Sequence, residues 1–112
     1  MSAVVAGATT YGVGKAAQAD VRRSMDEPAY DAAAFIGYHA RAGAKKGVLC
    51  HTWTDKVAGV WLNDTEVGEI GLNAAVCGSF GAGVALITGD RAAVQEAIDL
   101  LGPIESVVVK SA

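Results

Sequence analysis

Short apolar runs alternate with polar, glycine-containing segments from about residue 30 to the end of the chain. Residues 32–38 (AAAFIGY) form a continuous apolar run, which is typical of a strand buried on both faces. Residues 48–50 predict a second short strand. Residues 57–62 and 65–67 predict two more strands, and the Asn63-Asp64 pair between them indicates a hairpin turn.

The segment after this hairpin predicts a buried helix over residues 68–80 (GEIGLNAAVCGSF). It is apolar nearly all round, and such a helix is expected in the interior. Its polar side chains Glu69 and Asn73 are four residues apart, so they share one helix face.

The last third of the chain predicts a strand, a helix and a final strand. Residues 84–88 (VALIT) form the first apolar run, and Asp90 suits the N-cap of the helix that follows. Apolar side chains recur in that helix at positions 94, 97, 98 and 101, and Gly102-Pro103 ends it. Residues 104–110 (IESVVVK) predict the final strand.

This order of elements predicts parallel strands joined by helical crossovers. We therefore expect an α/β fold, a three-layer-like sheet with parallel βαβ units and a β-hairpin. Residues 1–24 differ from the rest, because they are rich in Ala and Gly and show no clean period. We interpret them as an unassigned arm and residues 25–112 as the α/β domain.

The arm contains GATTYGVGK, which invites comparison with a phosphate-binding loop. A Walker A loop requires glycine five residues before Gly14, where this chain has Thr9, and Ala16 replaces the required Ser or Thr. Nucleotide binding therefore stays a third hypothesis, which an effect of Lys15→Ala on nucleotide affinity would support.

Composition narrows the class of protein. The chain has 112 residues, 52% of them hydrophobic and 19% charged, with a net charge of −3, so neither disorder nor nucleic-acid binding is expected. No apolar run reaches the length of a membrane span. Cys50 and Cys77 form no CxxC pair, and the start lacks a secretory pattern, so we expect a cytoplasmic protein.

Candidate chemistry lies at strand ends and at one helix start. His39 and His51, the two histidines of the chain, each follow a predicted strand, and Glu69 opens the predicted buried helix. Functional groups gather at the carboxyl ends of parallel strands, and Zn²⁺ accepts imidazole nitrogen and carboxylate oxygen. Each residue also has a structural interpretation: the histidines as satisfied polar residues, and Glu69 as a solvated acid at the helix start.

The strings FIGYHARAG, CHTW, LNDTEVGEIGLNAAVCG and ITGDRAAVQEA together resemble the bacterial zinc D-aminopeptidase family of metallopeptidases, over about residues 25–110. The resemblance implies that His39 and Glu69 bind zinc and that His51 is the catalytic histidine. Arg41 and Asn73 lie inside the matching motifs, and the resemblance implies only a supporting role for them. Cys50 departs from the serine that relatives tend to have before the catalytic histidine. The family's site resembles a two-zinc centre acting on short peptides, notably those beginning with a D-amino acid, in ring-like homo-oligomers.

Two parts of the family pattern are not found in this sequence. They are an initial strand with Asp-x-Glu-Gly and a later Asn-Asp-Ser-His segment; residues 1–24 hold Asp20 as their single acid and no histidine. We therefore expect a fragment of a larger domain, with only part of the zinc ligand set, impaired activity and self-association through exposed sheet edges. The alternative function is a non-catalytic oligomerising or binding module that retains the fold.

Overall fold

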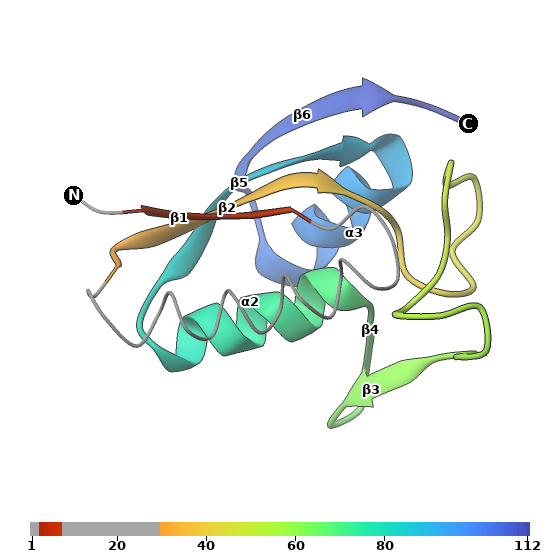
Figure 1. The fold of residues 1–112 in the computed structure, drawn as a ribbon, viewed down its shortest axis with the longest axis horizontal. Coiled ribbons are helices and arrows are strands. Elements are labelled where there is room, and N and C mark those ends of the chain that lie inside the picture. Colours follow the sequence, from red (N-terminus) through yellow and green to blue (C-terminus); the bar gives the residue numbers. More distant parts are fainter. Residues whose placement is uncertain (1–2, 8–29) are drawn as a thin grey trace.

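A computed structural model describes residues 3–7 and 30–112. Its main feature is a four-stranded sheet in the order β1-β2-β5-β6, in which every neighbouring pair is parallel (Figure 1). The strands are β1 (Ala3–Gly7), β2 (Ala32–Tyr38), β5 (Gly83–Asp90) and β6 (Glu105–Lys110). The predicted α/β class and its parallel βαβ units are confirmed.

The amino-terminal arm differs from its prediction at residues 3–7. This segment is the edge strand β1, which pairs with β2 from Ala3↔Ala32 to Gly7↔Ile36. A run of small residues lacks a clear period, yet its backbone groups still form a ladder beside an apolar strand. The rest of the arm, including most of GATTYGVGK, lies outside the described residues.

Between β2 and β5 the chain forms a separate hairpin and a helix. Strands β3 (Val60–Leu62) and β4 (Thr65–Val67) pair antiparallel, and Asn63 adopts a left-handed conformation in the turn with φ 53°. The predicted hairpin is confirmed, although its first strand is shorter than residues 57–62. Helix α2 (Glu69–Ser79) follows directly and packs against β2 and β5.

The prediction of a strand at residues 48–50 is wrong. This segment forms only an isolated bridge between Ala40 and Cys50, within the long loop from β2 to β3. The backbone N–H of Val48 donates to Asp90 Oδ2 at 2.6 Å. A side chain therefore accepts the hydrogen bond that a neighbouring strand would accept in a sheet. A run of only three apolar residues is compatible with either a strand or a loop, so the sequence could not decide between them.

Helix α3 (Arg91–Leu101) has the predicted ends. Asp90 is its N-cap and accepts from the backbone N–H of Ala93 at 2.8 Å. Gly102 ends the helix with φ 83°, a conformation that glycine adopts without strain. In the described part of the chain, neither α2 nor α3 is long and apolar enough to cross a membrane.

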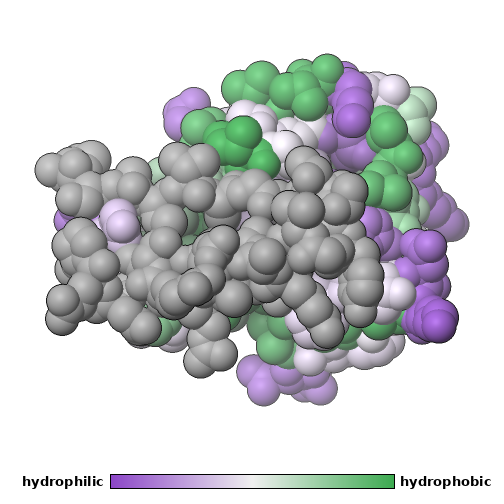
Figure 2. Space-filling model, viewed as in Figure 1, coloured by the Kyte–Doolittle hydropathy of each residue, from purple (hydrophilic) through white to green (hydrophobic). Residues whose placement is uncertain are grey.

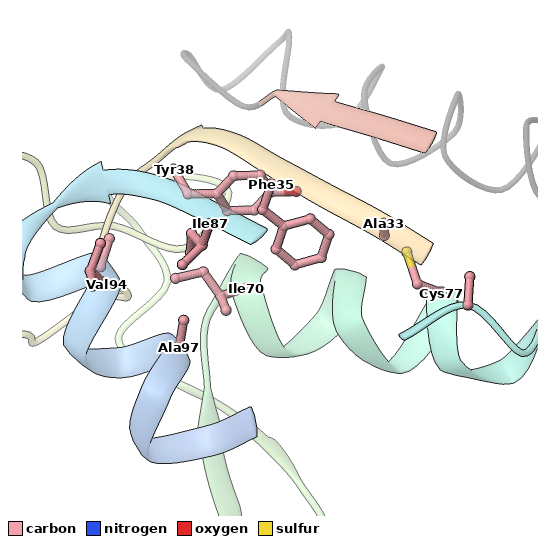
Figure 3. Close-up of a cluster of buried hydrophobic side chains, with 10 residues drawn as sticks. Ala33, Phe35, Tyr38, Ile70, Cys77, Ile87, Val94 and Ala97 are labelled. Atoms are coloured by element: carbon pink, nitrogen blue, oxygen red, sulfur yellow. The ribbon is translucent and has the colours of Figure 1, made fainter. Parts of the chain in front are cut away.

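The hydrophobic core lies between one face of the sheet and both of these helices (Figure 3). Ala33 and Phe35 of β2 contribute from the strand, and Ile70 and Cys77 contribute from α2. Helix α2 is buried on this face only, because Ala75 on its other side is exposed, which corrects the prediction of a fully buried helix. The third layer of the predicted arrangement is not tested by the described residues.

A bulge at the end of β2 determines which side chains enter the core. Gly37 has φ 72°, and the pairing with β5 shifts register between Phe35 and Tyr38. The extra residue turns Tyr38 to the core side, where its ring stacks on Phe35 at 4.5 Å. The bulge therefore also sets the direction in which the next residue, His39, leaves the sheet.

The edge strand β6 carries exposed apolar side chains. Val107, Val108 and Val109 are 52%, 37% and 59% exposed. Hydrophobic residues gather over β6 along the top of the face in Figure 2.

Candidate metal centre

Three side chains from three different segments meet at the carboxyl end of the sheet. His39 follows β2, His51 lies in the long loop after it, and Glu69 is the first residue of α2. All three are buried, with exposed fractions of 7%, 8% and 2%. These are the three residues that the sequence singled out, and the structure brings all of them together.

The ligand atoms of the three side chains are close enough to share one ion. Glu69 Oε1 lies 3.6 Å from His39 Nε2 and 3.8 Å from His51 Nε2, and the ligand atoms of the group all lie within 4.8 Å of one another. Zinc bonds of about 2.0–2.2 Å place the ligand atoms of a tetrahedron roughly 3.3–3.6 Å apart. The two distances to Glu69 approach this spacing, so the donor set fits zinc with small adjustments.

The orientation of His39 is fixed by the backbone of the next residue, Ala40. Its Nδ1 lies 3.1 Å from the carbonyl oxygen of Ala40, which can only accept, so Nδ1 carries the proton. In the neutral ring, Nε2 then presents its lone pair toward Glu69, which is the arrangement that a metal ligand requires. Burial alone lowers the pKa of His39, but the Glu69 carboxylate outweighs this effect, and the net pKa is raised.

Glu69 is held by a backbone donor as well as by its helix. The N–H of Trp53 donates to Glu69 Oε1 at 2.7 Å, and Trp53 adopts a left-handed conformation with φ 59°. Burial raises the pKa of Glu69, but His39, the Trp53 N–H and the charge of His51 lower it further than burial raises it. A buried carboxylate that stays ionised is suited to bind a cation.

The loop that carries His51 is tied to the segment after β2. The N–H of His51 donates to the Ala40 carbonyl at 3.3 Å, and the N–H of Ala42 donates to Thr52 Oγ1 at 3.1 Å. The imidazole rings of His39 and His51 stack with centroids 4.2 Å apart and an interplanar angle of 22°. These contacts fix the position of His51 although no strand carries it.

A carboxylate from α3 connects the segments that carry His39 and Glu69. Glu96 Oε2 accepts from the N–H of Arg41 at 2.8 Å. A Cβ on Gly68 would lie 2.5 Å from Arg41 Cβ and 3.0 Å from Glu96 Oε1, so glycine is needed where the two segments touch. Burial raises the pKa of Glu96. Sequence reasoning missed Glu96, because an acidic residue among the polar positions of a helix does not indicate a contact with a distant loop.

Two residues with predicted supporting roles make contacts beside the centre. The amide of Asn73 donates to the hydroxyl of Tyr38 at 2.8 Å, and both side chains are buried. Asn73 and Glu69 share the inner face of α2, as their spacing predicted. The guanidinium of Arg41 forms an ion pair with Glu66 of β4 at 3.0 Å, which links the hairpin to the loop after β2.

A parallel α/β sheet with two imidazoles and one carboxylate gathered at its carboxyl end places this protein in the α/β class, with a candidate metal site of the type that zinc hydrolases use. The particular family follows from comparison with known sequences. The D-aminopeptidase family matches residues 11–112, and the chain belongs to this family. The predicted resemblance is confirmed, and the match begins earlier than the predicted boundary at residue 25.

Two similar proteins show how much of a relative this chain represents. A D-aminopeptidase of Bacillus subtilis (strain 168) is 41% identical over 78 residues, which cover 70% of this chain and 28% of that protein. A solved structure, the Zn-dependent D-aminopeptidase DppA from Bacillus subtilis, a self-compartmentalizing protease, matches with a TM-score of 0.64 and 37% identity. That match covers 73% of this chain and 30% of the other. The chain therefore spans less than a third of these relatives.

Proposed function

We propose that this chain forms the zinc-binding part of a hydrolase that removes the N-terminal residue of short peptides, notably those beginning with a D-amino acid. The observation that carries the proposal is the buried group of His39, His51 and Glu69, with ligand atoms within 4.8 Å of one another. Membership of the D-aminopeptidase family and the zinc dependence of DppA support it.

His39 and Glu69 are the proposed zinc ligands. The Ala40 carbonyl keeps His39 Nε2 available, and the Trp53 N–H holds Glu69 in place. A zinc ion bound there would polarise the scissile carbonyl and lower the pKa of a bound water. Burial of the three side chains excludes water and strengthens the electrostatic interactions at the site.

His51 is the proposed catalytic residue, and its position suits the transfer of a proton at Nε2. That atom lies 3.8 Å from Glu69 Oε1, within reach of a water or amide nitrogen held at the proposed ligands. The same position makes His51 available as a third ligand, and three protein ligands plus an open position are typical of catalytic zinc. These two roles predict different results for one variant.

The test compares zinc content and peptide turnover in three proteins: wild type, His39→Ala and His51→Ala. We expect His39→Ala to lose most of the zinc that copurifies with the wild type. We expect His51→Ala to keep zinc and to lose the release of D-alanine from D-alanyl-D-alanine. Loss of zinc from both variants would assign His51 as a ligand. Near-zero zinc in wild type and His39→Ala alike would contradict the ligand assignment.

The same assay addresses the alternative, a non-catalytic module that retains the fold. That alternative expects no turnover with added Zn²⁺, although the Ala40 and Trp53 contacts would still order His39 and Glu69. Turnover that His51→Ala abolishes would exclude it.

The two-zinc centre, the homo-oligomer and the cytoplasmic location are further proposals. Within residues 3–7 and 30–112, His39, His51 and Glu69 form a single group of ligands, so a second ion would need ligands from elsewhere. The self-compartmentalizing character of DppA supports an oligomer. Cys50 and Cys77 are free thiols, as is usual in a reducing compartment.

A further inference from the structure

A second feature of the carboxyl end of the sheet is a pocket of about 300 Å³ beside the metal centre. We call it the β6 pocket, since the end of β6 forms one wall. Its wall includes His39, Val48, Leu49, Asp90, Val109 and Lys110. Because His39 is part of the wall, a molecule in the pocket lies next to this one of the two proposed zinc ligands. The carboxyl ends of parallel strands are also where α/β proteins bind their ligands.

Most of the β6 pocket is apolar, and a hydrogen bond anchors the loop that forms part of its wall. Val48 and Leu49 from the long loop and Val109 from β6 are 46%, 44% and 59% exposed, so their surface is available to a small apolar group. Asp90 Oδ2 accepts from the N–H of Val48, which anchors this part of the loop to the start of α3. A pocket that is already formed loses less free energy when a ligand orders in it.

Two charged side chains line the β6 pocket, Asp90 and Lys110, and of these only Lys110 is exposed to a ligand. Asp90, the acidic residue of the wall, is only 2% exposed, and its two oxygens accept from the N–H groups of Val48 and Ala93. Lys110 is exposed at the carboxyl end of β6, and no ion pair found among the described residues engages it. A lysine at the rim of an apolar pocket favours an anionic ligand such as a carboxylate.

We propose that the β6 pocket binds the peptide residue that carries the free α-carboxylate, with Lys110 contacting the carboxylate and Leu49 contacting the side chain. The inference rests on the proposed function, which places the scissile amide at His39, Glu69 and His51. The residue after that amide then enters the adjoining pocket, and in a dipeptide this residue bears the carboxylate. The chain would therefore prefer dipeptides to longer or amidated peptides.

The test measures binding to the metal-free full-length chain, in which hydrolysis does not interfere. D-alanyl-D-alanine and its C-terminal amide are titrated separately and followed by NMR chemical shifts. We expect the free acid to bind about tenfold more tightly than the amide. Lys110→Met should abolish this preference, and Lys110→Arg should retain most of it. Lys56→Met, at an exposed loop lysine outside the pocket, is the matched control and should change neither affinity.

A second variant separates the apolar wall from the charge. Leu49→Ser should weaken binding of the acid and the amide by the same factor and leave their ratio unchanged. Equal acid-to-amide ratios in wild type and Lys110→Met, or no measurable binding of either peptide, would overturn the inference. A lysine-dependent preference without zinc binding or turnover would instead refute the proposed function and support the pocket. Turnover without a lysine-dependent preference would support the proposed function and refute the role of the pocket.

Discussion

At the scale of single residues, the metal centre depends on backbone groups as much as on its own side chains. The Ala40 carbonyl selects the His39 tautomer, and the Trp53 N–H holds Glu69. Almost every residue has these backbone groups, so nothing in the sequence distinguished Ala40 or Trp53. The side chains could be predicted because His39, His51 and Glu69 are chemically distinctive and lie within recognisable motifs.

The raised pKa of His39 makes zinc binding sensitive to pH. Zinc must displace the proton from His39 Nε2, so its affinity falls as the pH falls through the pKa of that imidazole. Displacement of one proton changes the affinity by about tenfold per pH unit below that pKa. Because the Glu69 carboxylate raises the pKa, the steep region begins at a higher pH than for a free imidazole.

Competition with a chromophoric chelator between pH 5.5 and 8 measures this dependence. In Glu69→Gln, which loses a proposed ligand and the charge that raises the His39 pKa, the affinity should be lower and the steep region should begin at a lower pH. The same steep region in both proteins would contradict the role of Glu69.

The metal-free chain has a stability dependence of related origin. His39 has a raised pKa in the folded chain, so its pairing with Glu69 stabilises the fold fully below the pKa of the unfolded imidazole. That contribution is lost as the pH rises through the folded pKa. Glu69 has a lowered pKa, so its contribution is lost as the pH falls toward and below the ordinary carboxyl range. Stability from this pair is therefore greatest in mildly acidic solution.

At the scale of elements, the helix starts and the long loop were unequally predictable. Asp90 was identified as the N-cap of α3 because a capping side chain before an apolar period is a local pattern. Its second contact, with Val48, joins positions 42 residues apart and has no local pattern. The same long-range bond explains why residues 48–50 form a loop that faces the β6 pocket and do not form a strand.

Replacing Asp90 tests both contacts at once. Asp90→Ala removes the N-cap, at about 1 kcal/mol, and leaves the Val48 N–H without its acceptor, at about 1–3 kcal/mol. We expect the free energy of unfolding, measured with urea, to fall by about 2–4 kcal/mol. Asp99→Ala is the control and should change this free energy by less than about 0.5 kcal/mol, because Asp99 is exposed and, among the described residues, accepts only from Gln95. Equal effects of the two variants would contradict the double role of Asp90.

At the scale of the whole molecule, the sheet ends in a parallel edge strand with apolar side chains. In β6, the side chains of Val107, Val108 and Val109 are all at least 37% exposed. A strand edge of this kind is a template for pairing with another chain unless something covers it. The exposed valines therefore support the proposed self-association independently of the family.

Light scattering on the purified chain should give a mass above the monomer value of 11.3 kDa. Val107→Lys places a charge on the edge strand and should shift the equilibrium toward the monomer. Trp61→Lys provides the comparison, since Trp61 is 58% exposed but lies on the hairpin. A monomeric wild type, or dissociation by Trp61→Lys alone, would refute association through β6.

The sequence by itself determined the elements that follow from local periodicity. These are strand β2, the hairpin, helices α2 and α3, and the parallel class that their alternation implies. It also indicated the candidate metal-binding residues, because the chain has two histidines and because His39, His51 and Glu69 lie in recognisable motifs.

Only the tertiary structure decided how these parts meet. The pairing of β1, the loop at residues 48–50 and the contact of Glu96 with Arg41 all depend on groups far apart in the chain. The convergence of three ligand atoms within 4.8 Å and the β6 pocket beside them also depend on residues that are far apart in the chain. Periodicity indicates which side of a helix or strand is buried. It does not indicate which other element covers that side, because that depends on packing between distant segments.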